Sequence, residues 1–289
     1  MFESISQLLN DSEIKGIPLP DLIIEDESEY QNSPKQIINE RLQRSLTIMK
    51  QSLEKALTSD IELPIKEASH QAKRMLSSPI FFGTHMKEAI AWAMAISEYN
   101  SGMGLIVAAP TAGASGVLPA VLFKAKEILE KSEEDLVNAL IVAAAIGAII
   151  GNRAMLSGSE GGCQAEVGVA SAMATAAITY MAGGSPNQIS NAIALNLKNI
   201  LGLVCDPVAG LVISPCIKRN AIGVVNAFLA AEMALSGVTS IIPADEIVDA
   251  MMKVGRKLPY ELKETGLGGI AATKTGKRIK KSIFSDSQG

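Results

Sequence analysis

Apolar side chains recur every three or four residues along most of the chain, which is the spacing of one face of an α-helix. The first long stripe follows Ser33-Pro34 and has Glu, Arg and Lys on its opposite face. Serine can cap free helix amides and proline is favoured in the first helical turn, so we expect a helix to open at Ser33-Pro34. The stripe consists of Ile38, Leu42, Leu46, Met49, Leu53 and Leu57.

Helical patterns account for most of the remaining sequence. The residues 132–135, Ser-Glu-Glu-Asp, have the form of a capping box, and Ser185-Pro186 marks another helix start. Alternation with a period of two residues, which would indicate strands, is nearly absent. The sequence therefore predicts an all-α fold, with one helical catalytic domain over 33–289. Further helices are expected over 64–76, 86–99, 117–129, 132–151, 164–181, 185–201, 220–236 and 244–257.

Residues 1–32 carry a weaker pattern. A short amphipathic piece over 2–9 is followed by Pro18, Pro20 and an acidic run over 25–29. We interpret this segment as a solvated N-terminal arm.

Composition limits the core and the compartment. Aromatic residues make up only 4% of the chain against 48% hydrophobic residues, so the core must consist of Ala, Val, Ile, Leu and Met. The net charge of −4 does not indicate a nucleic-acid-binding protein, which would usually be basic. The N-terminus does not resemble a secretory leader, and we expect a cytoplasmic protein. The longest run of small or apolar residues, 139–151, is shorter than the roughly 20 residues that a membrane span needs, so it predicts a buried core helix.

All three cysteines, Cys163, Cys205 and Cys216, lie in one stretch rich in glycine and proline. Such a backbone can bring thiolates together on one ion or cluster. Disulfides fit poorly because the count is odd and no signal peptide is visible. Three readings remain open from spacing alone: buried cysteines acting as small hydrophobes, a metal or iron–sulfur site, and a thiol nucleophile.

A second glycine-rich segment, Pro110-Thr-Ala-Gly-Ala-Ser-Gly116, leads into a predicted helix. Free amides at a helix N-terminus favour a carboxylate or phosphate. We therefore expect Thr111, Gly113, Ser115 and Gly116 to bind substrate, with a tight turn between packed helices as the alternative.

Several polar side chains near the cysteines are candidates for proton transfer. Lys198, Arg219 and Glu166 are the three that we consider, and the sequence does not assign the general base among them. Glu160 is expected to cap a first helical turn. The two histidines, His70 and His85, stand apart from any Cys, Asp or Glu pattern and are expected to be structural or solvated.

The tail contains another small-residue segment, residues 264–273, which could lie against a ligand. A basic end follows and is expected to be solvated. Its charges are Lys274, Lys277, Arg278, Lys280 and Lys281.

Five motifs in order resemble the α chain of bacterial iron–sulfur L-serine dehydratases. They are PTAGASGVLP, GGCQAEVG, GLVCDPVAGLV, PCIKRN and ETGLGGIAAT, and the resemblance covers the chain from about residue 34 onward. It implies that Cys163, Cys205 and Cys216 hold a [4Fe–4S] cluster, that no pyridoxal phosphate is used, and that a separate β chain completes a hetero-oligomer.

The resemblance also implies a reaction, the β-elimination of water from L-serine to give pyruvate and ammonia, with an open iron as Lewis acid. Two alternatives stay open: a related eliminase acting on L-threonine or L-cysteine, and a non-catalytic metal-binding partner chain. The chain departs from the family in one place, where Arg153 and Met155 replace small polar residues before Ser157-Gly158.

Overall fold

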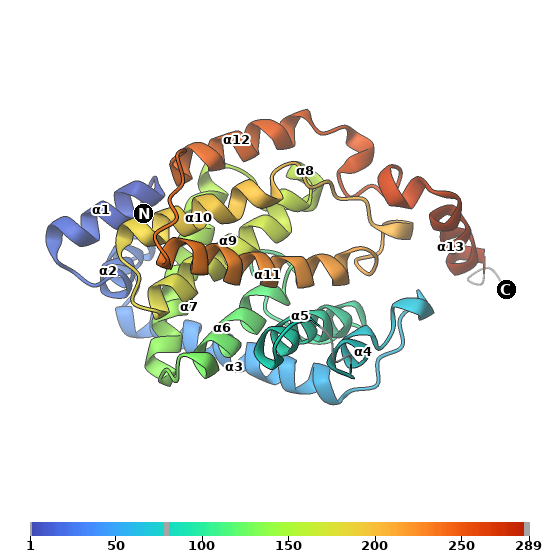
Figure 1. Cartoon of the computed structure of the whole chain (residues 1–289), viewed down its shortest axis with the longest axis horizontal. Coiled ribbons are helices and arrows are strands. Elements are labelled where there is room, and N and C mark those ends of the chain that lie inside the picture. The colour runs from blue at the N-terminus through green and yellow to red at the C-terminus, as the bar shows by residue number, and fades with distance from the viewer. Residues whose placement is uncertain (1, 78–80, 286–289) are drawn as a thin grey trace.

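Helices dominate the computed structural model, which describes residues 2–77 and 81–285 (Figure 1). Within these ranges there is no strand, only an isolated bridge between Cys205 and Lys263, so the all-α prediction is confirmed. The helices are α1 (Ile5–Lys15), α2 (Leu19–Gln31), α3 (Lys35–Thr58), α4 (Gln71–Ser77), α5 (Thr84–Ser101), α6 (Val117–Ile128), α7 (Glu133–Arg153), α8 (Gly158–Gly161), α9 (Cys163–Met181), α10 (Pro186–Ile200), α11 (Cys216–Leu235), α12 (Ala244–Lys257) and α13 (Lys274–Ser285), with short 3-10 turns at Lys66–Ala68, Val208–Gly210, Tyr260–Leu262 and Gly269–Ala272.

Helix α9 is the central element of the fold. Every residue from Cys163 to Met181 is buried except Tyr180, and α6, α7, α10 and α11 pack around it. A helix that is apolar or small on every side can be covered on every side. The chemistry carried by its first turn is therefore held on a scaffold with little freedom to move.

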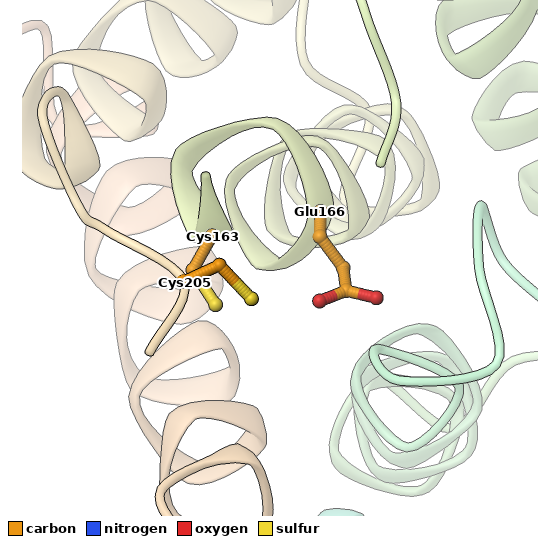
Figure 2. A group of neighbouring side chains, drawn as sticks. All are labelled: Cys163, Glu166 and Cys205. Carbon is orange, nitrogen blue, oxygen red and sulfur yellow. The ribbon is translucent and has the colours of Figure 1, made fainter. Parts of the chain in front are cut away.

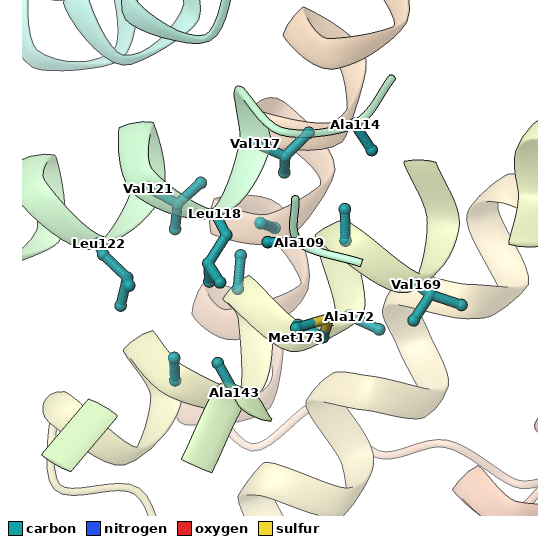
Figure 3. Close-up of a cluster of buried hydrophobic side chains, with 14 of the residues drawn as sticks. Ala109, Ala114, Val117, Leu118, Val121, Leu122, Ala143, Val169, Ala172 and Met173 are labelled. Atoms are coloured by element: carbon teal, nitrogen blue, oxygen red, sulfur yellow. The ribbon is translucent and has the colours of Figure 1, made fainter. Parts of the chain in front are cut away.

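The core is built from small aliphatic side chains, as the scarcity of aromatics predicts. Figure 3 shows alanines and valines of α6, α7 and α9 interleaved with Leu118, Leu122 and Met173. Gly147 of α7 lies so close to Met173 that a Cβ there would be 2.8 Å from the Met173 Sδ atom. Small residues thus let α7 and α9 approach closely, which compensates for the missing aromatic bulk.

Helix α7 contains the long apolar run. By length and composition it is the one helix of the described chain that could cross a membrane, yet 56% of its most apolar window is buried inside the protein. It packs against α9, α2, α3 and α6. This agrees with the prediction of a buried core helix.

Two predicted helix starts are confirmed, and each has a capping box, although a capping box was predicted only at Ser132. Ser132 and Asp135 form a reciprocal capping box at α7, and Ser185 and Gln188 form another at α10. Ser33 does not cap α3 as expected. That helix begins at Lys35, with Pro34 at the cap and no side-chain hydrogen bond.

The prediction of a solvated N-terminal arm is wrong. Ile5 and Leu8 of α1 are fully buried, and α1 packs against α10 and α12 while α2 packs against α7 and α3. Asp245 of α12 accepts hydrogen bonds from the backbone N–H groups of Ile5 and Ser6 at 2.9 and 3.0 Å, so a distant carboxylate caps α1. The acidic sequence obscured an apolar face that has a partner elsewhere in the chain.

Two other segments differ from prediction. Residues 64–76 form a 3-10 turn followed by α4 instead of one helix. The basic end forms α13, whose five predicted charges are all exposed, so it is solvated as expected but helical.

Candidate metal centre

The three cysteines lie on separate segments and all are buried. Cys163 opens α9 directly after Gly162, whose φ of +77° favours glycine, and Cys216 opens α11. Helix α11 begins four residues earlier than predicted, so both cysteines occupy helix N-termini. Cys205 lies in the connection between α10 and the turn at Val208–Gly210.

Two sulfurs and one carboxylate form the closest group. The Sγ atoms of Cys163 and Cys205 and a carboxylate oxygen of Glu166 all lie within 4.8 Å of one another, and Figure 2 shows the two sulfurs side by side with Glu166 one turn along α9. Cys216 is outside this group. Its charge nevertheless acts on Cys205, so it belongs to the same neighbourhood.

The thiol pKa values reflect this crowding. A hydrogen bond from Cys205, and then the positive charge of Arg219, lower the pKa of Cys163 against the effect of burial. The same hydrogen bond, together with burial, raises the pKa of Cys205. Burial, with the neighbouring Cys163, raises the pKa of Cys216. In the chain without metal, Cys163 is therefore the thiol most easily deprotonated.

Backbone hydrogen bonds fix the second cysteine. The Cys205 N–H donates to the Leu262 carbonyl at 2.8 Å, and the Glu264 N–H donates to the Cys205 carbonyl at 2.7 Å. Gly158 of α8 lies on its other side, where an added Cβ would be 2.7 Å from the Cys205 sulfur and 3.2 Å from Glu264 Oε2. Only a residue without a side chain fits there.

Sequence reasoning missed Glu264 as a site residue. Its carboxylate lies beside Gly158 and acts electrostatically on Glu166 and Cys216. The one feature of the sequence that could have indicated Glu264 is its position as the first residue of the small-residue segment 264–273. The parallel bridge that brings it beside Cys205 joins residues far apart in sequence and could not be predicted from local pattern.

Arg219 is committed to the protein and is not a free anion-binding fork. Its Nη2 atom donates to Asp206 at 2.7 Å, and its Nη1 atom donates to the Val204 carbonyl at 2.8 Å and to the Cys163 sulfur at 3.4 Å. The structure therefore brings Arg219 to the Cys163 sulfur, whereas Lys198 is exposed in the last turn of α10.

The glycine-rich loop lies against Glu166. Thr111 donates a short hydrogen bond to Glu166, and a Cβ on Gly113 would be 2.5 Å from the Glu166 Oε1 atom. The side chain of Asn220 in α11 binds the loop. It accepts a hydrogen bond from the Gly116 N–H at 3.1 Å and donates to the carbonyls of Gly113 and Cys216 at 2.8 and 3.0 Å. One side chain thus joins the loop to the helix start that carries the third cysteine.

Some hydrogen-bond donors of the glycine-rich loop have a partner within the protein and others have none. The N–H groups of Ser115 and Gly116 are used internally, while those of Ala112, Gly113 and Ala114 make no hydrogen bond within the described chain. The Ser115 hydroxyl is buried and unpartnered in the same part of the chain. The N–H groups left without a partner thus lie in the turn before the start of α6; of their residues, Ala112 is exposed and Gly113 and Ala114 are buried.

Burial raises the pKa of Glu166, and the Glu264 charge raises it further, while the hydrogen bond from Thr111 lowers it. A buried carboxyl group with a raised pKa can act in proton transfer.

The remaining candidates have structural partners. Glu160 lies in the first turn of α8, as predicted, but the cap is Ser157, whose hydroxyl accepts from the Glu160 N–H and donates to the Glu160 carboxylate. His70 contacts Glu62 and Asp60, and neither it nor His85 reaches the cysteines. His85 lies by Glu88 and Glu127, whose carboxylates each bind the buried Lys124 ammonium at 2.6 Å.

Arg153 and Met155 face α12. Arg153 binds the Asp249 carboxylate through two nitrogens at 2.8 and 3.0 Å. Met155 lies between Gly161 and Gly255, where a Cβ would meet its sulfur at 2.3 and 2.8 Å. These two substitutions therefore belong to the packing of α12.

The donor set fits a thiolate-bound metal or cluster. Three buried sulfurs with no disulfide partner, a glycine that leaves room beside one of them and a compensating guanidinium are typical of soft-ligand sites.

Comparison with known proteins decides the family. The family model described as "Serine dehydratase alpha chain" matches residues 14–271. The chain belongs to this family. It is 45% identical to the "Probable L-serine dehydratase, alpha chain" of Bacillus subtilis (strain 168), over 100% of this chain and 97% of the relative. It is 40% identical to the "L-serine dehydratase, alpha chain" of Peptoniphilus asaccharolyticus, over 99% of each. It is also 34% identical to the "L-serine dehydratase TdcG" of Escherichia coli (strain K12), over 93% of this chain and 61% of that longer protein.

Proposed function

We propose that this chain is the catalytic α chain of a [4Fe–4S]-dependent L-serine ammonia-lyase, which converts L-serine to pyruvate and ammonia. The observation that carries the proposal is the meeting of three buried cysteine segments with Glu166 and the glycine-rich loop. Family membership supports the substrate and reaction.

Cys163, Cys205 and Cys216 would hold the cluster. When bound through three thiolates, a [4Fe–4S] cluster supplies an iron without a protein sulfur, which serves as a Lewis acid for the departing hydroxyl. The proposed chemistry needs no pyridoxal phosphate.

The loop and Glu166 suit the two charged ends of an amino acid. The unpaired N–H groups of Ala112, Gly113 and Ala114 would bind the substrate carboxylate. Thr111 orients the Glu166 carboxylate, which lies beside Gly113 and would receive the Cα proton. The absence of a side chain at Gly113 is what lets the Glu166 carboxylate lie against the loop.

Proton transfer is the role that best suits Glu166 among the three candidates. It is buried, its pKa is raised by that burial, and it lies beside the sulfurs. Arg219 is saturated by Asp206, Val204 and Cys163, and Lys198 points to solvent. Glu166→Gln should lower kcat strongly, whereas Lys198→Met, the matched control, should leave turnover unchanged.

A β chain and a cytoplasmic location complete the proposal. The names of the two relatives covered over nearly their full length call them α chains, and the E. coli relative is longer than this chain. A second chain that supplies the remaining part would form a hetero-oligomer with this one. Reduced thiols suit the cytoplasm.

Anaerobic purification with the co-expressed β chain tests the function. We expect about four irons and four sulfides per α chain, and pyruvate formation from L-serine. Cys→Ser changes at the three cysteines should each abolish both colour and turnover. A colourless chain with full activity would refute the cluster. Faster turnover of L-threonine or L-cysteine would favour the related eliminase, and an iron-bound complex inert to all three would indicate a non-catalytic metal-binding chain.

A further inference from the structure

Arg219 is the one side chain of the described site that touches the segments of all three cysteines. It lies in the first turn of α11, three residues after Cys216. Its guanidinium donates to the Cys163 sulfur at 3.4 Å and to the carbonyl of Val204, the residue before Cys205, at 2.8 Å. A single rigid group therefore fixes the relative positions of three chain segments that are separate in sequence.

The charge of this buried group is balanced by one carboxylate. The Arg219 and Asp206 side chains are only 11% and 5% exposed, and Nη2 lies 2.7 Å from Asp206 Oδ1. A buried guanidinium requires such a partner, and its planar fork holds a fixed direction when both nitrogens are engaged. Asp206 thus sets the direction in which Arg219 points at the sulfur.

Asp206 also binds the tail. Its Oδ2 atom accepts the Ile270 N–H at 2.8 Å, and a Cβ on Gly269, at φ +54°, would be 2.1 Å from that oxygen. Glycine is thus required where the tail passes the carboxylate. The same tail segment carries Glu264, which pairs with Cys205 through the backbone.

We propose that Arg219 and Asp206 form a positioning clamp that aligns the three cysteine segments and fastens the segment 264–273 over them. The proposal rests on the proposed function only in assuming that the cysteines hold iron. Arg219 acts through the sulfurs and takes no part in binding the substrate. Its N–H···S hydrogen bond and charge stabilise electron density on the Cys163 sulfur, which raises the reduction potential of a cluster bound there.

Three variants of the co-expressed, iron-loaded complex test the clamp. Arg219→Lys keeps the charge but loses the fork, Arg219→Met removes the charge, and Asp206→Asn removes the counter-ion. Arg153→Lys is the matched control, because it weakens another Arg–Asp pair, which joins the end of α7 to Asp249 of α12 and includes no hydrogen bond to a cysteine.

We expect iron to leave for a chelator about tenfold faster in the Arg219 and Asp206 variants, the effect of losing a hydrogen bond to a charged group. The cluster of Arg219→Met should have a lower reduction potential and an altered electron paramagnetic resonance spectrum. Helical circular dichroism and the iron release of Arg153→Lys should match the wild type. Wild-type release rates and potentials in both Arg219 variants would overturn the clamp.

Hydrogen exchange separates the clamp from the function. In Asp206→Asn the Ile270 amide and the segment 264–273 should exchange faster, with or without iron. If the wild-type complex binds no iron, the proposed function fails, and the exchange data alone decide the clamp. Unchanged exchange there refutes it. If an Arg219 variant fails to fold, Asp206→Asn still provides both readouts.

Discussion

Gly158→Ala provides a sharp test of the metal centre, because one methyl group would be placed against a proposed ligand. Gly158 is the first residue of α8, and its backbone is not in the left-handed region that disfavours alanine. The new Cβ would lie 2.7 Å from the Cys205 sulfur. Any effect must therefore come from side-chain contacts, of which the one with the sulfur is the shortest and the one with Glu264 Oε2, at 3.2 Å, is the next, and not from backbone strain.

The size of the effect follows from the geometry. The contact is about 0.7 Å shorter than the 3.4 Å at which ordinary contacts begin. Cys205 cannot retreat with its backbone, because two hydrogen bonds hold it to Leu262 and Glu264. Overpacking of this kind costs about 1–3 kcal/mol, so the sulfur should leave its position in favour of another rotamer. With a factor of ten for each 1.4 kcal/mol, retention of iron should weaken about five- to hundredfold.

Gly168→Ala is the control. Gly168 lies inside α9, and a Cβ there would meet Ile200 Cγ2 at 3.5 Å, an ordinary contact. Alanine in a helix interior should then stabilise the chain by up to about 1 kcal/mol. Iron and sulfide content, the visible spectrum and release to a chelator are measured for both variants, with circular dichroism to establish folding. A folded Gly158→Ala chain that holds iron as tightly as wild type would refute the reasoning that Cys205 binds from this position.

The remaining predictions concern the loop, the buried carboxyl group and the N-terminus. Gly113→Val should raise KM for L-serine, because the side chain would displace Glu166; unchanged KM in a folded variant would place the carboxylate site elsewhere. Burial raises the pKa of Glu166, so its protonated form favours folding, and this contribution is lost as pH rises through the folded pKa. Glu166→Gln should therefore make the metal-free chain more resistant to urea at pH 8 and about equal to wild type at pH 4, and a loss of stability at pH 8 would contradict this. Asp245→Ala should cost about 1–2 kcal/mol and speed hydrogen exchange in α1, because it removes the cap on Ile5; wild-type exchange there would show that the cap contributes nothing.

Local pattern predicted the helices well and the contacts between them poorly. The stripe from Ile38 to Leu57, the capping box at Ser132 and the helix start at Ser185-Pro186 depend on residues close in sequence, and the structure follows them. The N-terminal helices depend on a distant partner. Asp245, 240 residues from Ile5, completes α1, and no local signal announces it.

The site shows the same division. The cysteines and Glu166 could be chosen as site residues from the sequence. Thiols are ligands for soft metals, a carboxyl group can transfer protons, and both lie within the motifs. Two contacts of the site depend on how the tail packs against the α10–α11 connection. Arg219 binds Asp206, and Glu264 lies beside Cys205. Contacts between residues far apart in sequence leave no periodic pattern from which they could be predicted.

Three glycines of the motifs share a physical role in addition to the backbone freedom that Gly269, at φ +54°, also uses. Gly158, Gly113 and Gly269 each lie where a Cβ would strike a sulfur or a carboxylate oxygen, at 2.7, 2.5 and 2.1 Å. Each therefore allows one functional side chain to lie directly against the backbone of another segment. Because these segments are also fixed by hydrogen bonds, substitution cannot be absorbed by movement of the loop. The glycine-rich motifs thus allow the close packing of Cys205, Glu166 and Asp206. Substitution of one of these glycines should displace the neighbouring functional side chain before it unfolds the protein.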